Sequence, residues 1–200
     1  MFVQHDFNFI FVAVPKTGCT SVAHSLSLNL DQPVSEYHAT VKDVIERNED
    51  FKHYFKFGFV RNPWDRMVSL YSETITSYQN FNALAHPTFS DIIIREFESF
   101  HDFVLRHRDF GLHEKTHFLP CSHFLTIDNE IAVDFVGRFE NLESDYINAC
   151  GKMGWNLAPR LYHARKSDRS SDYKMYYTKK SRELISKIYE EDIERFNYVF

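Results

Sequence analysis

The sequence predicts one α/β domain over residues 1–200, built on a central, mainly parallel β-sheet flanked by helices. Three observations predict it. Phe9–Val14 is a short, uninterrupted apolar run, which is typical of a strand buried on both faces of a parallel sheet. A tight polar loop and a segment with apolar residues at helical spacing follow this run. A second strand followed by a helix is predicted from Tyr54 onward, and strands that alternate with helices favour a layered α/β architecture.

The bulk composition agrees with a single folded domain. The chain has 200 residues, of which 44% are hydrophobic and 16% aromatic, with only 6 Gly and 6 Pro. A chain of that length can bury a proper core, and nothing in its composition suggests disorder. Phe supplies 20 residues, so we expect an aromatic-rich core. No internal repeat or linker divides the chain, and we therefore place no domain boundary.

The first half of the chain contains the two clearest strand-to-helix units. After Phe9–Val14, residues 22–30 carry apolar side chains at helical spacing. Tyr54–Val60 alternates and is aromatic, which predicts a second strand. Asn62 is then a good N-cap and Pro63 suits the first helical position, so a helix is expected to start there.

The second half is predicted in less detail. Residues 77–115 are expected to be mostly helical. Val133–Phe139 is predicted to be another strand, and Asn141 is expected to cap the helix that follows it. Near the end, Thr178 is expected to cap a single helix that runs to about Phe196.

The distribution of charge limits the classes of partner. The net charge of -5 at pH 7 argues against a general nucleic-acid binder, whose surface is usually basic. The segment from Arg160 to Arg182 nevertheless holds eight Lys or Arg against two Asp, a local charge of about +6. A basic segment in an acidic chain suits one small, highly charged ligand better than a long polymer.

Cysteine usage and hydropathy predict a soluble, cytoplasmic protein without a membrane span. Cys19, Cys121 and Cys150 are odd in number and far apart, so we expect neither a disulfide framework nor a zinc-like pairing. No apolar run approaches the ~18 residues of a membrane-spanning helix. Met1–Asn8 contains Asp6 and lacks a basic leader, so no signal peptide is expected.

The segment Val14–Ser21 predicts a site for a phosphate-like anion. Gly18 can adopt backbone angles that turn successive N–H groups toward an anion, and Lys16 adds a positive charge. The helix that follows contributes the positive end of its dipole, and the loop hydroxyls can donate hydrogen bonds. These hydroxyls belong to Thr17, Thr20 and Ser21. The alternative is an ordinary polar turn with an exposed lysine, since Lys and Thr are common in turns.

The order of residues in this loop argues against a nucleotide kinase. The P-loop of such enzymes has the pattern G-x-x-x-x-G-K-[ST], in which the Lys follows the second Gly. Here Lys16 precedes Gly18, and no Gly lies upstream of Gly18. The chain also lacks a clear Mg²⁺-binding Asp after a predicted strand.

A second anion site is predicted at the end of the next strand. Arg61 directly follows that strand, where open α/β sheets place ligand groups, and Ser69 lies two turns along the next helix. Arg offers a planar, permanently charged fork that suits a phosphate monoester. The alternative is that Arg61 forms a surface ion pair and that Ser69 is an ordinary helical serine.

Two neighbours of this site are expected to be structural. Arg66 has Asp65 and Glu73 as candidate partners, so we expect a surface salt bridge. Trp64 is expected to pack against apolar residues, with the groove of a cofactor as its alternative location.

Together the two motifs resemble the sulfotransferases that use 3'-phosphoadenosine 5'-phosphosulfate (PAPS), in particular the carbohydrate sulfotransferases and their bacterial relatives. In that family a P-K-T-G-x-T-S loop holds the 5'-phosphosulfate. An Arg after the next strand, with a Ser eight residues later, holds the 3'-phosphate. Pro15–Ser21 and the pair of Arg61 and Ser69 match these positions. The resemblance implies a P-loop-like domain that uses PAPS and requires no metal.

Three further stretches look like the same family, namely Glu36–Val41, Val133–Leu142 and Tyr173–Phe200. The resemblance is thin between about Ser77 and Ile131, where acceptor recognition often lies in the family. It therefore covers both ends and most of the chain.

The chain departs from the family pattern at two positions. Cys19 occupies a loop position that is often Gly or another small residue, and Arg165 stands where the family often has Asn before Lys-Ser. The basic loop is still expected to close over the 3'-phosphate. The residues that the resemblance assigns to the nucleotide are Lys16, Thr17, Gly18, Cys19, Thr20, Ser21, Arg61, Ser69, Lys166 and Ser167.

The predicted activity is transfer of a sulfuryl group from PAPS to an acceptor hydroxyl, for which the resemblance favours a carbohydrate. Lys16 is the predicted catalytic cation. His38 is the predicted general base, because imidazole titrates near neutrality and the family uses a His or Glu in this part of the chain. An ordinary histidine at a helix entry is the alternative. The reserve candidates for the base are His113, Glu114 and His117.

Two other functions are weighed against this one, a P-loop nucleotide kinase and a non-catalytic phosphonucleotide-binding protein. No metal is expected, because no cluster of His, Cys and Asp has the spacing of metal ligands. Small alcohols, lipids and tyrosine stay open as acceptors, and the sequence does not predict an oligomeric state.

Overall fold

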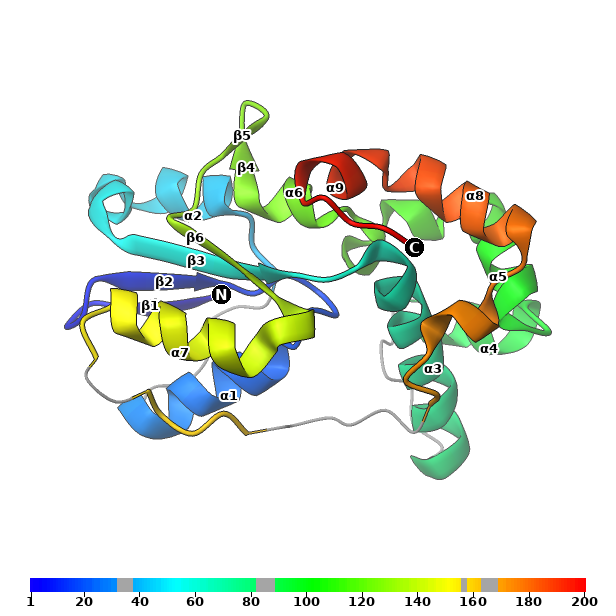
Figure 1. The fold of residues 1–200 in the computed structure, drawn as a ribbon, viewed down its shortest axis with the longest axis horizontal. Helices are drawn as coiled ribbons and strands as arrows, with labels where there is room; N and C mark the ends of the chain where they lie inside the picture. Colours follow the sequence, from blue (N-terminus) through cyan, green and yellow to red (C-terminus); the bar gives the residue numbers. More distant parts are fainter. Residues whose placement is uncertain (32–37, 82–88, 156–157, 163–168) are drawn as a thin grey trace. The chain divides into compact units, whose positions relative to one another are not determined.

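A four-stranded β-sheet in the order β1-β2-β3-β6 organises one part of the chain (Figure 1). The computed structural model describes residues 1–31, 38–81, 89–155, 158–162 and 169–200. They belong to two compact units. The sheet unit comprises Met1–Arg61 and Cys121–Arg165, and the helical unit comprises Asn62–Pro120 and Lys166–Phe200. The prediction of one domain over residues 1–200 stays a prediction.

The sheet is mainly parallel, as predicted. Its strands are β1 (Phe2–Gln4), β2 (Phe9–Val12), β3 (Phe55–Val60) and β6 (Phe135–Arg138). β2 pairs with β3 and β3 with β6 in parallel, whereas β1 pairs with β2 antiparallel. The sequence did not predict β1, because three residues are too few to show a period. The mixed α/β architecture around a mostly parallel sheet is confirmed.

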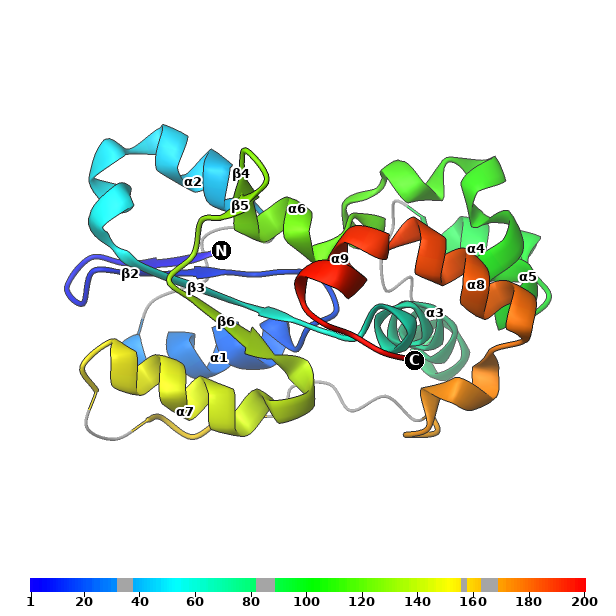
Figure 2. The same cartoon turned by 45° about the horizontal axis from the view of Figure 1, so that its top comes forward.

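Helices cover both faces of this sheet (Figure 2). On one face α1 (Cys19–Leu30) and α7 (Leu142–Lys152) pack against side chains of β2 and β3. The other side carries α2 (Val41–Arg47), α6 (Cys121–Leu125) and the hairpin of β4 (Thr126–Ile127) and β5 (Glu130–Ile131). All four residues of β2 are buried, which explains why its sequence is continuously apolar rather than alternating.

Phenylalanine dominates the core between the sheet and these two helices. Phe9, Phe11, Phe57 and Phe59 are each fully buried there, and neighbouring rings lie 5.2–6.2 Å apart between centroids. Burying such a side chain stabilises the folded state by roughly 1.5–3 kcal/mol. The expected aromatic core is therefore present, and it fixes the ends of β2 and β3, from which the candidate site begins.

The helical unit begins with α3 (Pro63–Phe81), whose start was predicted correctly. The side-chain oxygen of Asn62 accepts hydrogen bonds from the backbone N–H groups of Trp64 (3.1 Å) and Asp65 (3.4 Å), so it caps the helix. The other α-helices of this unit are α4 (Ser90–Glu96), α5 (Phe100–Arg106), α8 (Lys179–Ile188) and α9 (Glu190–Arg195). Short 3-10 helices span His107–Phe110, Leu112–Glu114, Thr116–Phe118 and Tyr173–Tyr176.

The single helix predicted from Thr178 to about Phe196 is wrong, because the chain breaks it at Tyr189. Thr178 does cap α8, in a reciprocal capping box with Ser181. Tyr189 then leaves the helical region (φ -112°, ψ 30°), and its hydroxyl donates to the carbonyl oxygen of Phe118 at 2.8 Å. The acidic run that follows it, from Glu190 to Asp192, suits the start of a new helix.

The remaining predicted elements agree with the structure in type. The strand expected at Val133–Phe139 is β6, and Asn141 precedes α7 without a side-chain hydrogen bond to it. The described part of 77–115 consists of the end of α3, α4, α5 and two 3-10 helices. Within the described ranges, no helix has the length and apolar character needed to cross a membrane.

Candidate functional site

The loop between β2 and α1 has an unusual backbone path. Lys16 has φ 66° and Gly18 has φ 80°, so the chain enters the left-handed region twice within three residues. Thr17 lies between them, fully buried, and its hydroxyl donates to the carbonyl oxygen of Val14 at 2.9 Å. A left-handed non-glycine residue costs of order 1–3 kcal/mol and is found where the surroundings fix it, often at functional sites. The Thr17 hydroxyl thus stabilises the turn that presents Lys16.

Gly18 is required at its position for two independent reasons. Its φ of 80° disfavours other residues, and an added Cβ would lie 2.7 Å from a methyl group of Leu142 and 3.2 Å from the ring of Phe139. Gly18 is also the N-cap of α1 and provides no side-chain hydrogen bond to that helix. The backbone N–H groups in the first turn of the twelve-residue helix α1 therefore have no side-chain cap. Such N–H groups at the start of a helix favour a bound anion.

The side chains that follow Gly18 have different environments. Cys19 is only 6% exposed and packs in the core with α1 and the sheet. Burial raises the pKa of its thiol, while the charge of Lys16 opposes this shift. Thr20 is half-buried and Ser21 is buried. Because its side chain is buried in the core, Cys19 can contact an anion only through its backbone N–H.

Arg61 follows β3 directly and lies beside this loop. Its guanidinium donates from Nη1 to the carbonyl oxygen of Lys16 at 3.0 Å. The same group stacks on the ring of Phe139, with 3.7 Å between its central carbon and the ring centroid. The side chain is only 5% exposed. The alternative, a surface location for Arg61, does not fit this buried side chain. The ends of β2 and β3 bring Lys16 and Arg61 together.

His38 lies on the same side of the sheet unit as the end of β2. Its Nδ1 is 2.8 Å from the carbonyl oxygen of Ala13, the residue that follows β2. A carbonyl oxygen only accepts, so Nδ1 carries the proton and Nε2 bears the lone pair of the neutral ring. His38 itself has φ 66°, a second left-handed non-glycine residue at the candidate site.

Ser69 and its neighbours belong to the helical unit. Ser69 is buried on α3. Arg66 is only 4% exposed and donates from Nη2 to the carbonyl oxygens of His117 (3.2 Å) and Leu119 (2.7 Å). Asp65 pairs with Arg169. The surface location expected for Arg66 is wrong, because its side chain is buried and donates to backbone carbonyls of the same unit. An ion pair of Arg66 with Asp65 or Glu73 stays a prediction.

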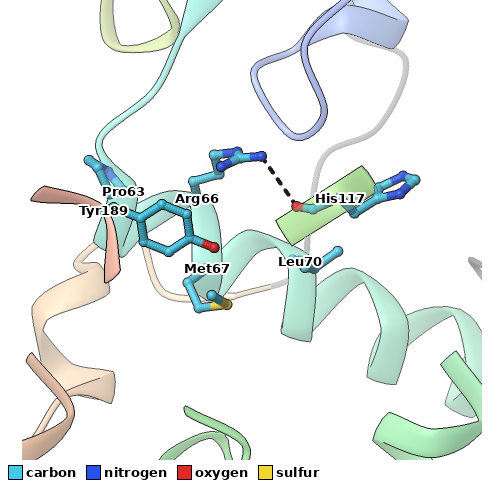
Figure 3. A pocket seen from close by; sticks show the side chains of 6 residues that line it. All are labelled: Pro63, Arg66, Met67, Leu70, His117 and Tyr189. Atoms are coloured by element: carbon cyan, nitrogen blue, oxygen red, sulfur yellow. Dashed lines mark hydrogen bonds between the residues drawn. The ribbon is translucent and has the colours of Figure 1, made fainter. Parts of the chain in front are cut away.

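A shallow hollow lies next to Arg66 (Figure 3). It measures about 170 Å³ including space open to solvent. Its lining consists of Pro63, Arg66, Met67, Leu70, His117 and Tyr189. The ring of His117 points away from the hollow (Figure 3). His113 and Glu114, the other reserve candidates for the base, are not among its lining residues.

The reserve candidates for the base are spread over two 3-10 helices. His113 Nε2 lies 3.9 Å from a carboxylate oxygen of Glu114, whose side chain is 78% exposed. The ring of His117 lies against Phe89, with 5.3 Å between the centroids. Lys166 and Ser167 lie outside the described residues. Within the described part of the chain, no group of three or more His, Cys, Asp or Glu could hold a metal ion.

Three structural contributions were not foreseen from the sequence. They are the Ala13 carbonyl that orients His38, the Phe139 ring under Arg61, and the second set of hydrogen bonds made by Asn62. The first two are contacts between residues far apart in sequence, for which no local pattern exists. The sequence predicted that Asn62 caps α3 through its side-chain oxygen. It did not predict the two hydrogen bonds that the side-chain nitrogen donates.

Comparison with known proteins places the chain in a family. The model of the sulfotransferase family matches residues 1–199. Among curated proteins, carbohydrate sulfotransferase 11 of Rattus norvegicus is 23% identical over 98% of this chain and 66% of its own length. Carbohydrate sulfotransferase 9 of Homo sapiens is 25% identical over 99% of this chain and 53% of its own length. Carbohydrate sulfotransferase 14 of Mus musculus is 28% identical over 86% and 50%, respectively.

The chain thus spans about half to two thirds of the length of these curated relatives. No solved structure matches it significantly. The family match covers both units and includes the loop of Lys16 and the strand end of Arg61. The resemblance inferred from those two motifs is confirmed, and the chain belongs to the sulfotransferase family.

Proposed function

We propose that this protein transfers a sulfuryl group from PAPS to a hydroxyl group of a carbohydrate. Membership of the sulfotransferase family supports PAPS as the donor, and relatives named as carbohydrate sulfotransferases support the sugar acceptor. The structural observation that carries the proposal is the contact between Arg61 and the backbone of Lys16. It unites the two motifs at the carboxyl ends of neighbouring parallel strands.

The residues of the loop fit a phosphosulfate group. The loop combines a lysine, the left-handed Gly18 and the start of α1 without a side-chain cap, and each of these favours an anion. We assign the 5'-phosphosulfate to Lys16 through Ser21. The loop then requires no carboxylate or metal to hold the donor.

We assign the 3'-phosphate to Arg61 and Ser69. A guanidinium presents its N–H donors in one plane, an arrangement that matches the oxygens of a phosphate monoester. Stacking on Phe139 holds that plane in a fixed orientation, which lowers the entropic cost of binding a phosphate. Lys166 and Ser167 complete the assignment as predictions from the sequence.

Sulfuryl transfer resembles phosphoryl transfer through a loose transition state, so positioning and charge stabilisation dominate. The acceptor oxygen forms a bond to sulfur while the bond from sulfur to the bridging phosphate oxygen breaks. The electron pair of that bond stays with 3'-phosphoadenosine 5'-phosphate, and Lys16 with the loop N–H groups stabilises the growing charge. The acceptor proton goes to a general base.

We propose His38 as that base. The bond from Nδ1 to Ala13 assigns the lone pair to Nε2, the atom that would take the proton. The Ala13 carbonyl would also stabilise the protonated ring, as the orienting partner of a catalytic histidine does in other enzymes. His113, Glu114 and His117 remain the alternatives.

The two competing functions differ in what they bind and in whether they turn over. A kinase is disfavoured by the Lys-before-Gly order and by the sulfotransferase family match. A non-catalytic phosphonucleotide-binding protein would bind the nucleotide without transferring sulfate. This second function would be supported if the nucleotide-binding residues are functional but no residue acts as the general base.

Calorimetry and a transfer assay test the proposal. The protein should bind 3'-phosphoadenosine 5'-phosphate and show weaker or no binding of ATP. Incubation with PAPS carrying radioactive sulfur and a set of unsulfated oligosaccharides should label at least one sugar. Preferential binding of ATP would overturn the donor assignment. Binding without transfer to sugars, small alcohols, lipids or tyrosine peptides would support the non-catalytic function instead.

Two further predictions accompany this function. We propose a cytoplasmic location from the sequence, in which Cys19, Cys121 and Cys150 are odd in number and far apart. Imaging of the tagged full-length protein in its own cells tests it. Activity without a metal is supported by the chemistry assigned to Lys16 and the loop, and undiminished turnover after treatment with a chelator is the expected result.

A further inference from the structure

The first turn of α3 is held by residues from the other end of the helical unit. The side-chain oxygen of Asn62 caps α3, and its amide nitrogen donates to the hydroxyl of Tyr173 (3.1 Å) and to the carbonyl oxygen of Val199 (2.9 Å). Asn62 is 7% exposed. Both hydrogens of its amide and its oxygen are thus used in hydrogen bonds, which leaves the side chain one orientation.

An aromatic cage lies beside these bonds and holds Phe200. The ring of Phe200 meets Trp64, Tyr173 and Tyr177 edge-on, with centroid distances of 5.4, 5.8 and 5.7 Å. Such perpendicular contacts place the positive edge of one ring near the negative face of another. Two cations also lie near this ring, the guanidinium of Arg182 at 5.2 Å from its centroid and the ammonium of Lys174 at 5.5 Å.

Trp64 joins the cage to the backbone of α3. Its indole N–H donates to the carbonyl oxygen of Arg182 at 3.1 Å. Its own carbonyl oxygen accepts from the hydroxyl of Tyr177 at 2.9 Å. Trp64 is buried and its ring contacts Phe200, in agreement with the expectation that it packs against apolar residues. Residues 62–64 are consequently fixed by side-chain and backbone contacts to residues within 173–200. We call this set of contacts the α3 latch.

We propose that Asn62 and the α3 latch are positioning elements for the nucleotide 3'-phosphate, an inference that rests on the proposed function. Ser69 lies on the helix that Asn62 caps. The cap and the latch contacts fix the first turns of α3, from which Ser69 is presented. The latch therefore acts through Ser69 rather than by touching the nucleotide.

This role predicts a specific change in nucleotide preference. The probes are 3'-phosphoadenosine 5'-phosphate and adenosine 5'-phosphate, which differ only in the 3'-phosphate. Phe200→Ala empties the cage without adding charge, and we expect about tenfold weaker binding of the first probe with a change of less than about twofold for the second, by isothermal titration calorimetry. Phe200→Tyr retains the ring and should restore the preference for the first probe.

Asn62→Ser tests the amide donors without adding a charge. The serine hydroxyl can still cap α3 but is too short to donate to both Tyr173 and Val199. We expect the same selective loss for 3'-phosphoadenosine 5'-phosphate. Met175→Ala is the matched control, because this side chain lies between two members of the cage in sequence and is 73% exposed. It should leave both affinities unchanged.

The outcomes separate this inference from the proposed function. If the wild-type protein binds both probes equally, the proposed 3'-phosphate site fails and the positioning role fails with it. If the wild-type protein prefers the 3'-phosphate but Phe200→Ala and Asn62→Ser keep that preference, only the positioning role is overturned. An equal loss of both affinities with a lower melting temperature would show a purely structural latch and would also overturn it. Phe200→Leu provides the same comparison should Phe200→Ala not fold.

Discussion

Arg61 donates from its guanidinium to the carbonyl oxygen of Lys16, 3.0 Å away, although 45 residues separate the two. The contact arises because β2 and β3 are neighbouring parallel strands, whose carboxyl ends lie at one edge of the sheet. The buried cation thus stabilises the backbone of the loop that presents Lys16. A change at Arg61 should affect that loop as well as the assigned 3'-phosphate.

The first prediction concerns the fork of Arg61. Arg61→Lys keeps the positive charge but loses the planar donors and the stacking on Phe139. A hydrogen bond to a charged group contributes about 1.5–3 kcal/mol, so binding of 3'-phosphoadenosine 5'-phosphate should weaken about tenfold to hundredfold by calorimetry. Arg108→Lys is the matched control, because Arg108 is exposed and lies outside the basic segment. Equal affinities of Arg61→Lys and wild type would remove Arg61 from the nucleotide site.

The second prediction concerns the catalytic charge. Lys16→Ala should lower kcat on the order of 10²–10³-fold, by analogy with the loss of one donor to a developing anion. The readout is the initial rate with saturating PAPS. Because Lys16 has φ 66°, Lys16→Gly serves as a second variant without the backbone strain of alanine. Both variants should lose activity to a similar extent, and an active Lys16→Gly would exclude the ammonium from the mechanism.

The third prediction concerns His38 as the base. Loss of a positioned general base typically costs about 10²–10⁴-fold in rate, and His38→Ala should also abolish the fall in kcat on the acidic side of the pH–rate profile. The structure assigns Nε2 as the acceptor, so His38→Gln, which cannot take up a proton, should be as inactive as His38→Ala. His24→Ala, at an exposed histidine of the same unit, should behave as wild type. A surviving acidic limb in His38→Ala would direct attention to His113, Glu114 and His117.

The local parts of this site were predictable, whereas its long-range contacts were not. Phe9–Val14 and Tyr54–Val60 are short apolar or alternating runs, so the strands and the turns after them could be placed from sequence alone. The stacking of Arg61 on Phe139 joins different parts of the chain, and no local period encodes it. For the same reason Arg66 was expected at the surface, although it is buried and donates to carbonyl oxygens more than 50 residues away.

Breaks and very short elements were the other source of error. The run from Thr178 to Phe196 keeps helical spacing throughout, so nothing in it predicted a break at Tyr189. The hydroxyl of Tyr189 donates to the carbonyl oxygen of Phe118, a contact that no local pattern encodes. β1 has three residues and is held by its pairing with β2, which is a property of the folded sheet. Gly18, by contrast, was identified correctly, because a positive φ is a local requirement with a local signal.

The fourth prediction separates the two constraints on Gly18 by comparing three glycines. Gly151→Ala meets nothing within 4 Å in α7 and should be neutral or stabilising by up to ~1 kcal/mol. Gly111→Ala also has open space but a φ of 67°, so it should cost ~1 kcal/mol or more. Gly18→Ala combines a φ of 80° with a contact of 2.7 Å to Leu142 and should cost at least ~2 kcal/mol. The free energy of unfolding, measured in urea, tests all three variants. Equal costs for Gly18→Ala and Gly111→Ala would show that the Leu142 side chain moves aside to make room for the new methyl group.

The last prediction concerns the helix that follows His38, and it has a defined pH dependence. The Thr40 side chain, followed by the Thr40 backbone, lowers the pKa of Asp43 below its ordinary value of 3.8 in the capping box of α2. A lowered folded-state pKa contributes stability that is present above the unfolded value and lost as the pH falls through the folded value. Thr40→Ala should therefore lower the free energy of unfolding by ~1 kcal/mol near neutrality, and the gap to wild type should shrink below about pH 3.8. Urea unfolding across this range measures it, with Lys42→Ala at an exposed position of the same helix as the control. A gap that stays constant down to the lowest pH would mean that Asp43 is not stabilised by Thr40.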